Sequence, residues 1–239
     1  MPTKMTGMST PTPHYYDNAN PTLLQVVEPD ASRIVEFGCG AGALARAVRQ
    51  THPQLHYTGV ELMPDQLALA GDALDVALVR NLDQIPDWSQ DAELATALPA
   101  DAFDHVIFGD VLEHLYDPAH VLGQAVRCLR PGGSALVCIP NVQHWSVLAQ
   151  LIRGHWPQQD SGLFDRTHIR WFTLRDMVQL LQGTGLVVEQ VVPRIFQPEA
   201  AQPLLQALAP AARLLGVDPD QLQKLALPLQ YVLVGRKPG

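Results

Sequence analysis

The sequence has few cysteines, few aromatic residues and no run of basic residues, and each shortage excludes a class of protein. Its three cysteines, Cys39, Cys128 and Cys138, are too scattered for a disulfide framework or a Cys-x-x-Cys zinc site. Lysine and arginine number 16 against 24 acidic residues, and the net charge of −8 argues against nucleic acid or a membrane surface as partner. No stretch reaches the ~18 apolar residues of a membrane helix, and residues 1–14 lack the apolar core of a signal peptide. We therefore expect a cytoplasmic protein with no membrane insertion.

The composition that remains is typical of a globular domain, with 47% hydrophobic and 17% charged residues. Residues 1–14 show no periodicity, so we expect a flexible N-terminal tail followed by a single domain over residues 15–239. From residue 15 to about residue 192, short β-branched runs alternate with longer amphipathic stretches, which predicts an α/β fold with a mostly parallel sheet. The expected strands are Arg33–Phe37, Leu55–Glu61, Val76–Arg80, Phe103–Gly109, Ser134–Ile139, Leu186–Val192 and Gln230–Gly235.

Capping and breaking signals divide the rest of the chain. Asp117 and Pro118 mark the start of a helix, and we expect Arg130-Pro131-Gly132-Gly133 to end it and turn into the next strand. Residues 193–228 are repeatedly interrupted by proline and read as an insertion between the last two strands, with a helix over Leu204–Leu215. We expect this insertion to pack as a surface cap, while a lid or a homodimer contact stays open.

A glycine-rich turn, Glu36-Phe37-Gly38-Cys39-Gly40-Ala41-Gly42, joins the first expected strand to a helix. Glycine lets the backbone turn sharply and approach a ligand closely, and the following helix start offers free N–H groups to a carboxylate or a phosphate. Glu61 ends the next strand about twenty residues further on, where an acid can accept hydrogen bonds from both ribose hydroxyls.

These residues permit two cofactors. Gly38-x-Gly40-x-x-Ala43 satisfies the dinucleotide fingerprint, so a NAD-dependent oxidoreductase is one hypothesis. However, the carboxylate of Glu36 would repel a pyrophosphate and attract an ammonium group, and the strand pattern leaves no second domain for hydride chemistry. A ligand with a carboxylate, an ammonium and an adenosine meets these demands, and that ligand is S-adenosyl-L-methionine.

With these pieces in place, the sequence resembles the class I methyltransferases. The resemblance rests on Glu36–Gly42, Glu61, Phe103–His114 and Leu129–Gly133. It implies a doubly wound, Rossmann-like sheet of seven strands in the order 3-2-1-4-5-7-6, with the last strand antiparallel, and S-adenosyl-L-homocysteine as the product cofactor. The cofactor-binding residues that it implies are Tyr16, Glu36, Gly38, Gly40, Gly42, Glu61, Leu62, Asn81, Leu82 and Asp110.

Two further segments, Asn141–Trp145 and Asp160–Thr173, resemble a subgroup associated with bacterial polysaccharide and O-antigen assembly. They are also similar to the methionine-biosynthesis protein of the W type. The subgroup implies methylation of an oxygen on a saccharide or glycan precursor. The second similarity adds another hypothesis, a non-catalytic protein that binds S-adenosylmethionine and regulates a partner enzyme.

A hydroxyl acceptor must lose its proton as it attacks the methyl group, so oxygen methylation needs a base. Asp110 and His114 follow the fourth expected strand at the carboxyl edge of the sheet, where open α/β sheets bind ligands. On a helix they would be i, i+4 neighbours, and the aspartate would orient the imidazole. We therefore expect both to be catalytic, with a purely structural His114 as the alternative.

Residues 141–172 combine histidines, arginines and tryptophans in an otherwise acidic chain, and we expect them to wall the acceptor pocket. The alternative is that an Asp165–Arg170 or Asp160–Arg166 ion pair only ties this loop down. No cluster in the sequence has metal-ligand spacing, so no metal is expected. The expected acceptor-binding residues are Asn141, His144, Asp165, Arg166 and His168.

Overall fold

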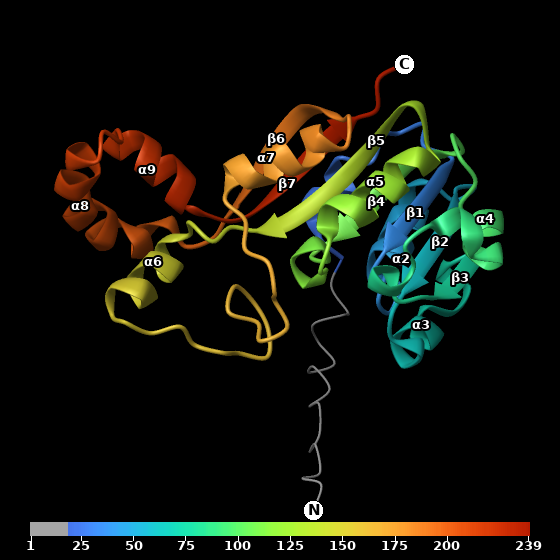
Figure 1. The fold of residues 1–239 in the computed structure, drawn as a ribbon, viewed down its shortest axis with the longest axis horizontal. Helices are drawn as coiled ribbons and strands as arrows, with labels where there is room; N and C mark the ends of the chain where they lie inside the picture. Colours follow the sequence, from blue (N-terminus) through green and yellow to red (C-terminus); the bar gives the residue numbers. More distant parts are fainter. Residues whose placement is uncertain (1–18) are drawn as a thin grey trace, which may run out of the picture.

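A seven-stranded sheet forms the centre of the protein (Figure 1), whose computed structural model describes residues 19–239. The expected tail over residues 1–14 and Tyr16 lie outside the described residues. The strands run in the order β3-β2-β1-β4-β5-β7-β6; β1 to β5 pair in parallel, and β7 is antiparallel to both β5 and β6. The predicted order and the antiparallel last strand are thus confirmed. The strands are β1 (Arg33–Phe37), β2 (His56–Glu61), β3 (Val76–Val79), β4 (Phe103–Gly109), β5 (Leu129–Pro140), β6 (Val187–Ile195) and β7 (Pro228–Arg236).

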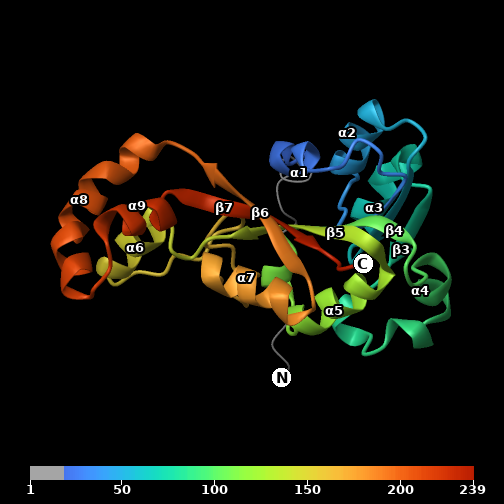
Figure 2. The same cartoon turned by 90° about the horizontal axis from the view of Figure 1, so that it is seen from above.

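Helices cover both faces of the sheet (Figure 2), as expected for parallel strands joined by crossovers. On one face lie α1 (Pro21–Gln25), α2 (Ala43–Thr51) and α3 (Pro64–Ala70), and on the other lie α4 (Ala92–Ala97), α5 (Pro118–Cys128) and α7 (Leu174–Gly183). Each face of the sheet has its own hydrophobic core. Neighbouring residues of β1 contribute to different cores, because Ile34 packs toward α2 on one face and Val35 toward α5 on the other. This alternation makes β1 apolar on both sides and places its carboxyl end between the two helical layers.

A small helical lobe lies beside the β6–β7 end of the sheet (Figure 1). It consists of α6 (Trp145–Ile152), α8 (Pro198–Leu214) and α9 (Pro219–Ala226), with a core of its own around Leu205 and Ala226. The helix predicted over Leu204–Leu215 starts earlier, at Pro198. Proline is favoured in the first turn of a helix, because the N–H group that it lacks would have no partner there. The Pro-rich insertion is also shorter than expected, since β6 continues to Ile195.

The strand β5 corrects a second expectation. The sequence predicts a turn over Arg130–Gly133, but this segment belongs to β5, which already pairs with β4 at Leu129. Leu129 pairs with Phe103 and Ser134 pairs with His105. A bulge between these two pairs accommodates the extra residues of β5. Gly133 permits this close pairing, because a Cβ there would lie 2.9 Å from the carbonyl oxygen of Phe103.

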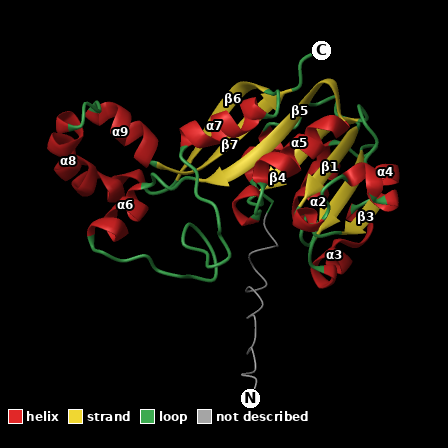
Figure 3. Cartoon of the chain, in the orientation of Figure 1, coloured by secondary structure: helices red, strands yellow, loops and turns green. Residues whose placement is uncertain are grey.

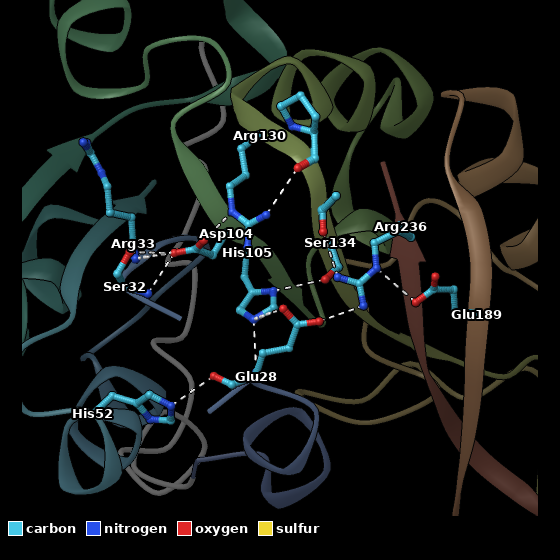
Figure 4. A network of polar contacts seen from close by, with 12 residues as sticks. Glu28, Ser32, Arg33, His52, Asp104, His105, Arg130, Ser134, Glu189 and Arg236 are labelled. Carbon is cyan, nitrogen blue, oxygen red and sulfur yellow. Dashed lines mark hydrogen bonds and ion pairs between the residues drawn. The ribbon is translucent and has the colours of Figure 1, made fainter. Parts of the chain in front are cut away.

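A network of hydrogen bonds and ion pairs joins the amino-terminal ends of β1 and β4, at the edge of the sheet opposite the loops that follow these strands (Figure 4). Asp104 accepts hydrogen bonds from the backbone N–H groups of Ser32 and Arg33 at 2.8 and 2.9 Å and from Arg130 Nε at 2.6 Å. Burial opposes ionisation of this carboxyl, but the Arg130 and backbone hydrogen bonds outweigh it and lower the pKa of Asp104 to about 2. The network therefore anchors the strands whose other ends carry the candidate site.

Candidate active site

A cavity of about 440 Å³ opens at the carboxyl edge of the sheet, where β1, β4 and β5 end. The segment leading into α1, the end of β6 and the start of β7 also border it. The long loop over residues 153–173, drawn in green in Figure 3, also reaches it through Gly162, Leu163 and His168. The charged or ionisable side chains in the described lining are Glu36, Cys39, Asp110, Glu113, His168 and Arg194.

The glycine-rich turn forms the wall of the cavity between β1 and α2. Gly38 and Gly40 line the cavity, whereas Gly42 caps α2 in the left-handed conformation with φ of 77°. Gly38 has φ of 71°, and a Cβ there would lie 2.4 Å from Cγ2 of Val111. Only glycine suits this position without displacing the segment after β4, as the sequence predicts for a turn that lets a ligand approach the backbone.

Glu36 is a buried carboxyl that borders the cavity at the end of β1. Its Oε2 accepts a hydrogen bond from the Tyr57 hydroxyl at 2.8 Å. Burial raises the pKa of Glu36 to about 7, and the nearby charge of Glu61 adds to the rise, while the Tyr57 hydrogen bond opposes it. A cationic group in the cavity would reverse this effect by stabilising the carboxylate.

Glu61 holds the glycine-rich turn in place. Its Oε2 accepts from the backbone N–H of Gly40 at 2.8 Å, and its Oε1 accepts from those of Leu62 and Met63 at 2.8 and 2.9 Å. A carboxylate offers about four acceptor positions, so ribose hydroxyls could use what remains. Glu61 does not border the cavity in the described structure, and its contact with ribose stays a prediction.

Three of the expected cofactor-binding residues, Leu62, Asn81 and Leu82, follow β2 and β3 and lie outside the described cavity lining. Leu62 is 54% exposed, whereas Leu82 is buried. Asn81 caps a short 3-10 turn (Leu82–Gln84), with its side-chain oxygen accepting from the N–H of Asp83 at 3.1 Å. The Asn81 amide oxygen is thus engaged in local structure, and cofactor binding by these three residues stays a prediction.

Asp110 follows β4 with φ of 57°, a left-handed conformation in which non-glycine residues are uncommon. Burial raises its pKa to about 6, against the opposing effects of Arg194 and of hydrogen bonds from Cys138 and Gln230. The condition for an i, i+4 contact with His114, an α-helix over this segment, is not met, because Asp110 is left-handed and a 3-10 turn (Leu112–His114) follows it. Asp110 borders the cavity but does not orient the imidazole.

His114 instead contacts the loop, with Nδ1 lying 3.2 Å from the carbonyl oxygen and 3.1 Å from the hydroxyl of Thr167. It is absent from the described cavity lining, whereas its neighbour Glu113 and the loop residue His168 are present. Burial lowers the pKa of His114 and lowers that of His168 to about 4. Both imidazoles are therefore neutral at pH 7, and a catalytic role for His114 stays a prediction.

Glu113 is the residue that sequence reasoning missed here. Its side chain is buried, neither carboxylate oxygen has a hydrogen-bond partner among the described residues, and Oε1 lies 3.9 Å from Nε2 of His168. Burial, and then the charge of Asp110, raise its pKa well above the ordinary value. Glu113, His114 and His168 also bring one ionisable atom each within 4.8 Å of one another, so a cation could approach them together. The expectation of no metal thus needs an experiment.

Two of the expected acceptor-binding residues hold the helical lobe. Asn141 is fully buried, and its amide donates to the carbonyl oxygens of Leu225 and Pro228 at 2.8 Å each, which ties β5 to the end of α9 and the start of β7. His144 is the N-cap of α6, where Nδ1 accepts from the N–H of Ser146 at 3.4 Å. Neither borders the cavity.

The three acceptor-binding residues expected on the loop, Asp165, Arg166 and His168, have different surroundings. Arg166 pairs with Asp160 at 2.7 Å, as the alternative account of this loop anticipates, and Asp165 accepts from the hydroxyl of Thr167 at 2.6 Å. Of the five expected acceptor-binding residues, only His168 borders the described cavity. Acceptor binding by the others stays a prediction.

Comparison with known proteins decides the family of this site. The methyltransferase-domain family matches residues 14–191, which include the glycine-rich turn, Glu61 and the segment after β4. The chain belongs to this methyltransferase family. The match supports S-adenosylmethionine as the cofactor of this methyltransferase rather than NAD, and supports an enzyme rather than a non-catalytic regulator.

Similar proteins agree with this assignment. The methyltransferase is 25% identical over 171 residues to the ubiquinone biosynthesis O-methyltransferase of Aeromonas salmonicida (strain A449), covering 71% of this chain and 69% of that protein. It is 30% identical over 122 residues to the trans-aconitate 2-methyltransferase of Azoarcus sp. (strain BH72), covering 51% and 44%. In fold it is similar to a SAM-dependent methyltransferase from Archaeoglobus fulgidus, with a TM-score of 0.58, 14% identity and 87% of each chain covered. Within residues 19–239, the helices lack the combined length and apolar character that crossing a membrane requires.

Proposed function

We propose that this methyltransferase transfers the methyl group of S-adenosylmethionine to an oxygen of a small acceptor, and that Glu113 accepts the proton. One observation carries the proposal: the buried carboxyl of Glu113, which has no hydrogen-bond partner within residues 19–239, borders the same cavity as Glu36 and the glycine-rich turn. A buried carboxyl without a hydrogen-bond partner is costly for stability, and such groups concentrate at functional sites.

The chemistry then needs little more than alignment and a proton acceptor. The acceptor oxygen forms a bond to the methyl carbon as the carbon–sulfur bond breaks, which leaves neutral S-adenosylhomocysteine. The hydroxyl proton passes to the carboxylate of Glu113. Burial raises the pKa of Glu113, which favours keeping the proton once it is accepted, while a sulfonium in the cavity would favour the ionised carboxylate before the transfer.

The relatives named above act, by their names, in ubiquinone biosynthesis and on trans-aconitate, and we favour a small hydroxylated molecule of this kind. The saccharide or glycan acceptor expected from the sequence is the competing proposal. Some of the residues that supported it have other partners, because Arg166 pairs with Asp160 and the ring centres of Trp156 and Trp171 lie 5.7 Å apart. A homodimer through α8 and α9 stays open.

The test is turnover of labelled S-adenosylmethionine against phenols, hydroxy acids and sugars. Glu113→Gln keeps the size of the side chain but cannot accept the proton, and we expect turnover to fall roughly 10²–10⁴-fold, with S-adenosylhomocysteine affinity nearly unchanged. Glu199→Gln, an exposed substitution on α8, is the matched control. Unaltered turnover of Glu113→Gln would remove the proton-acceptor role. Turnover lost with a chelator and restored by a divalent cation would contradict the expectation of no metal and assign the Glu113 cluster to a cation.

A further inference from the structure

Arg194 is the one lysine or arginine among the described residues that border the cavity. It lies near the end of β6, at the edge of the sheet. The other ionisable lining groups are carboxyls, a thiol and the neutral imidazole of His168. The guanidinium is therefore the only fixed positive charge that the described lining offers to a ligand.

Neutral groups orient Arg194, and Asp110 lies near enough for the guanidinium to oppose the rise of that carboxyl's pKa. Arg194 faces Gln230 across the β6–β7 pair, and its Nη1 donates to Oε1 of Gln230, whose own amide donates to Asp110. On another side, the guanidinium carbon lies 5.4 Å from the ring centre of Phe196. A neutral amide and an aromatic ring thus hold the cation in place.

Five arginines of the described chain are paired with carboxylates, whereas Arg194 belongs with those that are not, such as Arg33 and Arg46. Arg49, Arg80, Arg130, Arg166 and Arg236 each have a carboxylate oxygen at 3.0 Å or closer. Among residues 19–239, no carboxylate oxygen lies within ion-pair distance of Arg194. Since a guanidinium carries five N–H donors and Gln230 accepts from one, most of its donors remain for a ligand.

The position in the sheet indicates which ligand that is. Glu36 and the glycine-rich turn, which suit the cofactor's amino-acid part, follow β1, while Arg194 lies on β6, four strand positions away in the order β1-β4-β5-β7-β6. At ~4.8 Å per strand the two backbones are roughly 19 Å apart. Arg194 therefore borders the cavity from the side away from the glycine-rich turn, where we expect the acceptor rather than the cofactor's carboxylate.

We propose that the methyl acceptor carries an anionic group, a carboxylate or a phosphate, which Arg194 binds in a bidentate manner while Gln230 fixes the guanidinium. This inference rests on the proposed function, since it names a chemical feature of the acceptor of that same site. It makes Arg194 a residue that determines specificity, and it excludes a neutral hydroxyl compound as the preferred acceptor.

Binding to the full chain saturated with S-adenosylhomocysteine tests the inference without requiring turnover. The probes are matched pairs that differ in one anionic group: 4-hydroxybenzoate with 4-hydroxybenzyl alcohol, glucuronate with glucose, and glucose 6-phosphate with glucose. We expect at least one anionic member to bind roughly 10- to 100-fold more tightly than its neutral partner. The carboxylate and phosphate pairs distinguish the two sources of the charge.

Variants connect this preference to one residue. Arg194→Gln should remove the preference, Arg194→Lys should keep only part of it because an ammonium cannot form the two-pronged contact, and Arg213→Gln on the exposed end of α8 should leave it intact. The inference is overturned if no anionic probe binds at millimolar concentration, if both members of every pair bind alike, or if Arg194→Gln keeps the preference. Methylation of neutral hydroxyl compounds as fast as anionic ones would overturn it while leaving the proposed function intact. If the protein binds anionic probes more tightly through Arg194 but methylates no hydroxyl, the inference stands and the proposed function is refuted.

Discussion

Cofactor affinity should depend on pH through Glu36, whose burial raises its pKa to about 7 in the free protein. The ammonium of S-adenosylhomocysteine needs the ionised carboxylate, so below that pKa binding must first remove a proton. For one such group the dissociation constant scales as one plus the ratio of protonated to ionised carboxyl. Between pH 8 and pH 6 this factor grows from about 1.1 to about 11, so we expect affinity to fall about tenfold.

Calorimetric titration of S-adenosylhomocysteine at several pH values measures this slope, together with the proton released on binding. Glu36→Gln should bind more weakly at pH 8 and lose the slope between pH 6 and pH 8. Tyr57→Phe should move the midpoint to higher pH, because the Tyr57 hydrogen bond lowers the pKa of Glu36. Asp110, with a pKa raised to about 6, also borders the cavity, so Asp110→Asn is the control for its contribution. Affinity that stays constant from pH 6 to pH 8, or an unchanged slope in Glu36→Gln, would refute this reasoning.

Two further predictions concern stability. Asp104→Asn should lower the free energy of unfolding by about 2 kcal/mol at pH 7, since its pKa falls from 3.8 to about 2 on folding. That contribution is complete above pH 3.8 and is lost as the pH falls toward 2, so urea titrations should show the difference shrinking there; a constant difference, or an equal loss in exposed Asp30→Asn, would contradict it. Gly38→Ala should cost about 1–2 kcal/mol from its left-handed backbone alone and more from the contact with Val111. Adding Val111→Ala should relieve only the second part, and an unchanged urea midpoint in the single variant would count against the strain.

The features that the sequence predicts well are those that neighbouring residues determine. The strands Arg33–Phe37 and Phe103–Gly109 begin and end where expected, because short runs rich in β-branched and aromatic residues that end at or beside a glycine encode buried strands. The glycine-rich turn follows from the same local logic. The start of β5 was missed, because only pairing with β4 turns a proline-glycine segment into a strand.

The acceptor side of the site depends on contacts that are distant in sequence, which local patterns do not encode. Glu113 enters the cavity and His114 leaves it because the segment after β4 begins with Asp110 in a left-handed conformation and continues as a 3-10 turn. A signal for Glu113 was available, since it directly precedes His114 at the same strand edge. Arg194 had no comparable signal, because its place beside Gln230 follows from the antiparallel pairing of β6 and β7.

Burial of the carboxyls in the cavity prepares the site for a cation, and it also lowers the stability of the ligand-free protein. Glu36, Asp110 and Glu113 all have raised pKa values because burial penalises their charged forms. For Glu36 alone, a pKa of about 7 against the ordinary value of 4.5 means that folding loses about 3 kcal/mol of stability as the pH rises from 4.5 through 7. A ligand with an ammonium and a sulfonium compensates these carboxylates, whereas an anionic acceptor entering first would meet them uncompensated. Charge thus favours binding of the cofactor before the acceptor, and leaves Arg194 as the place where an acceptor's negative charge is stabilised.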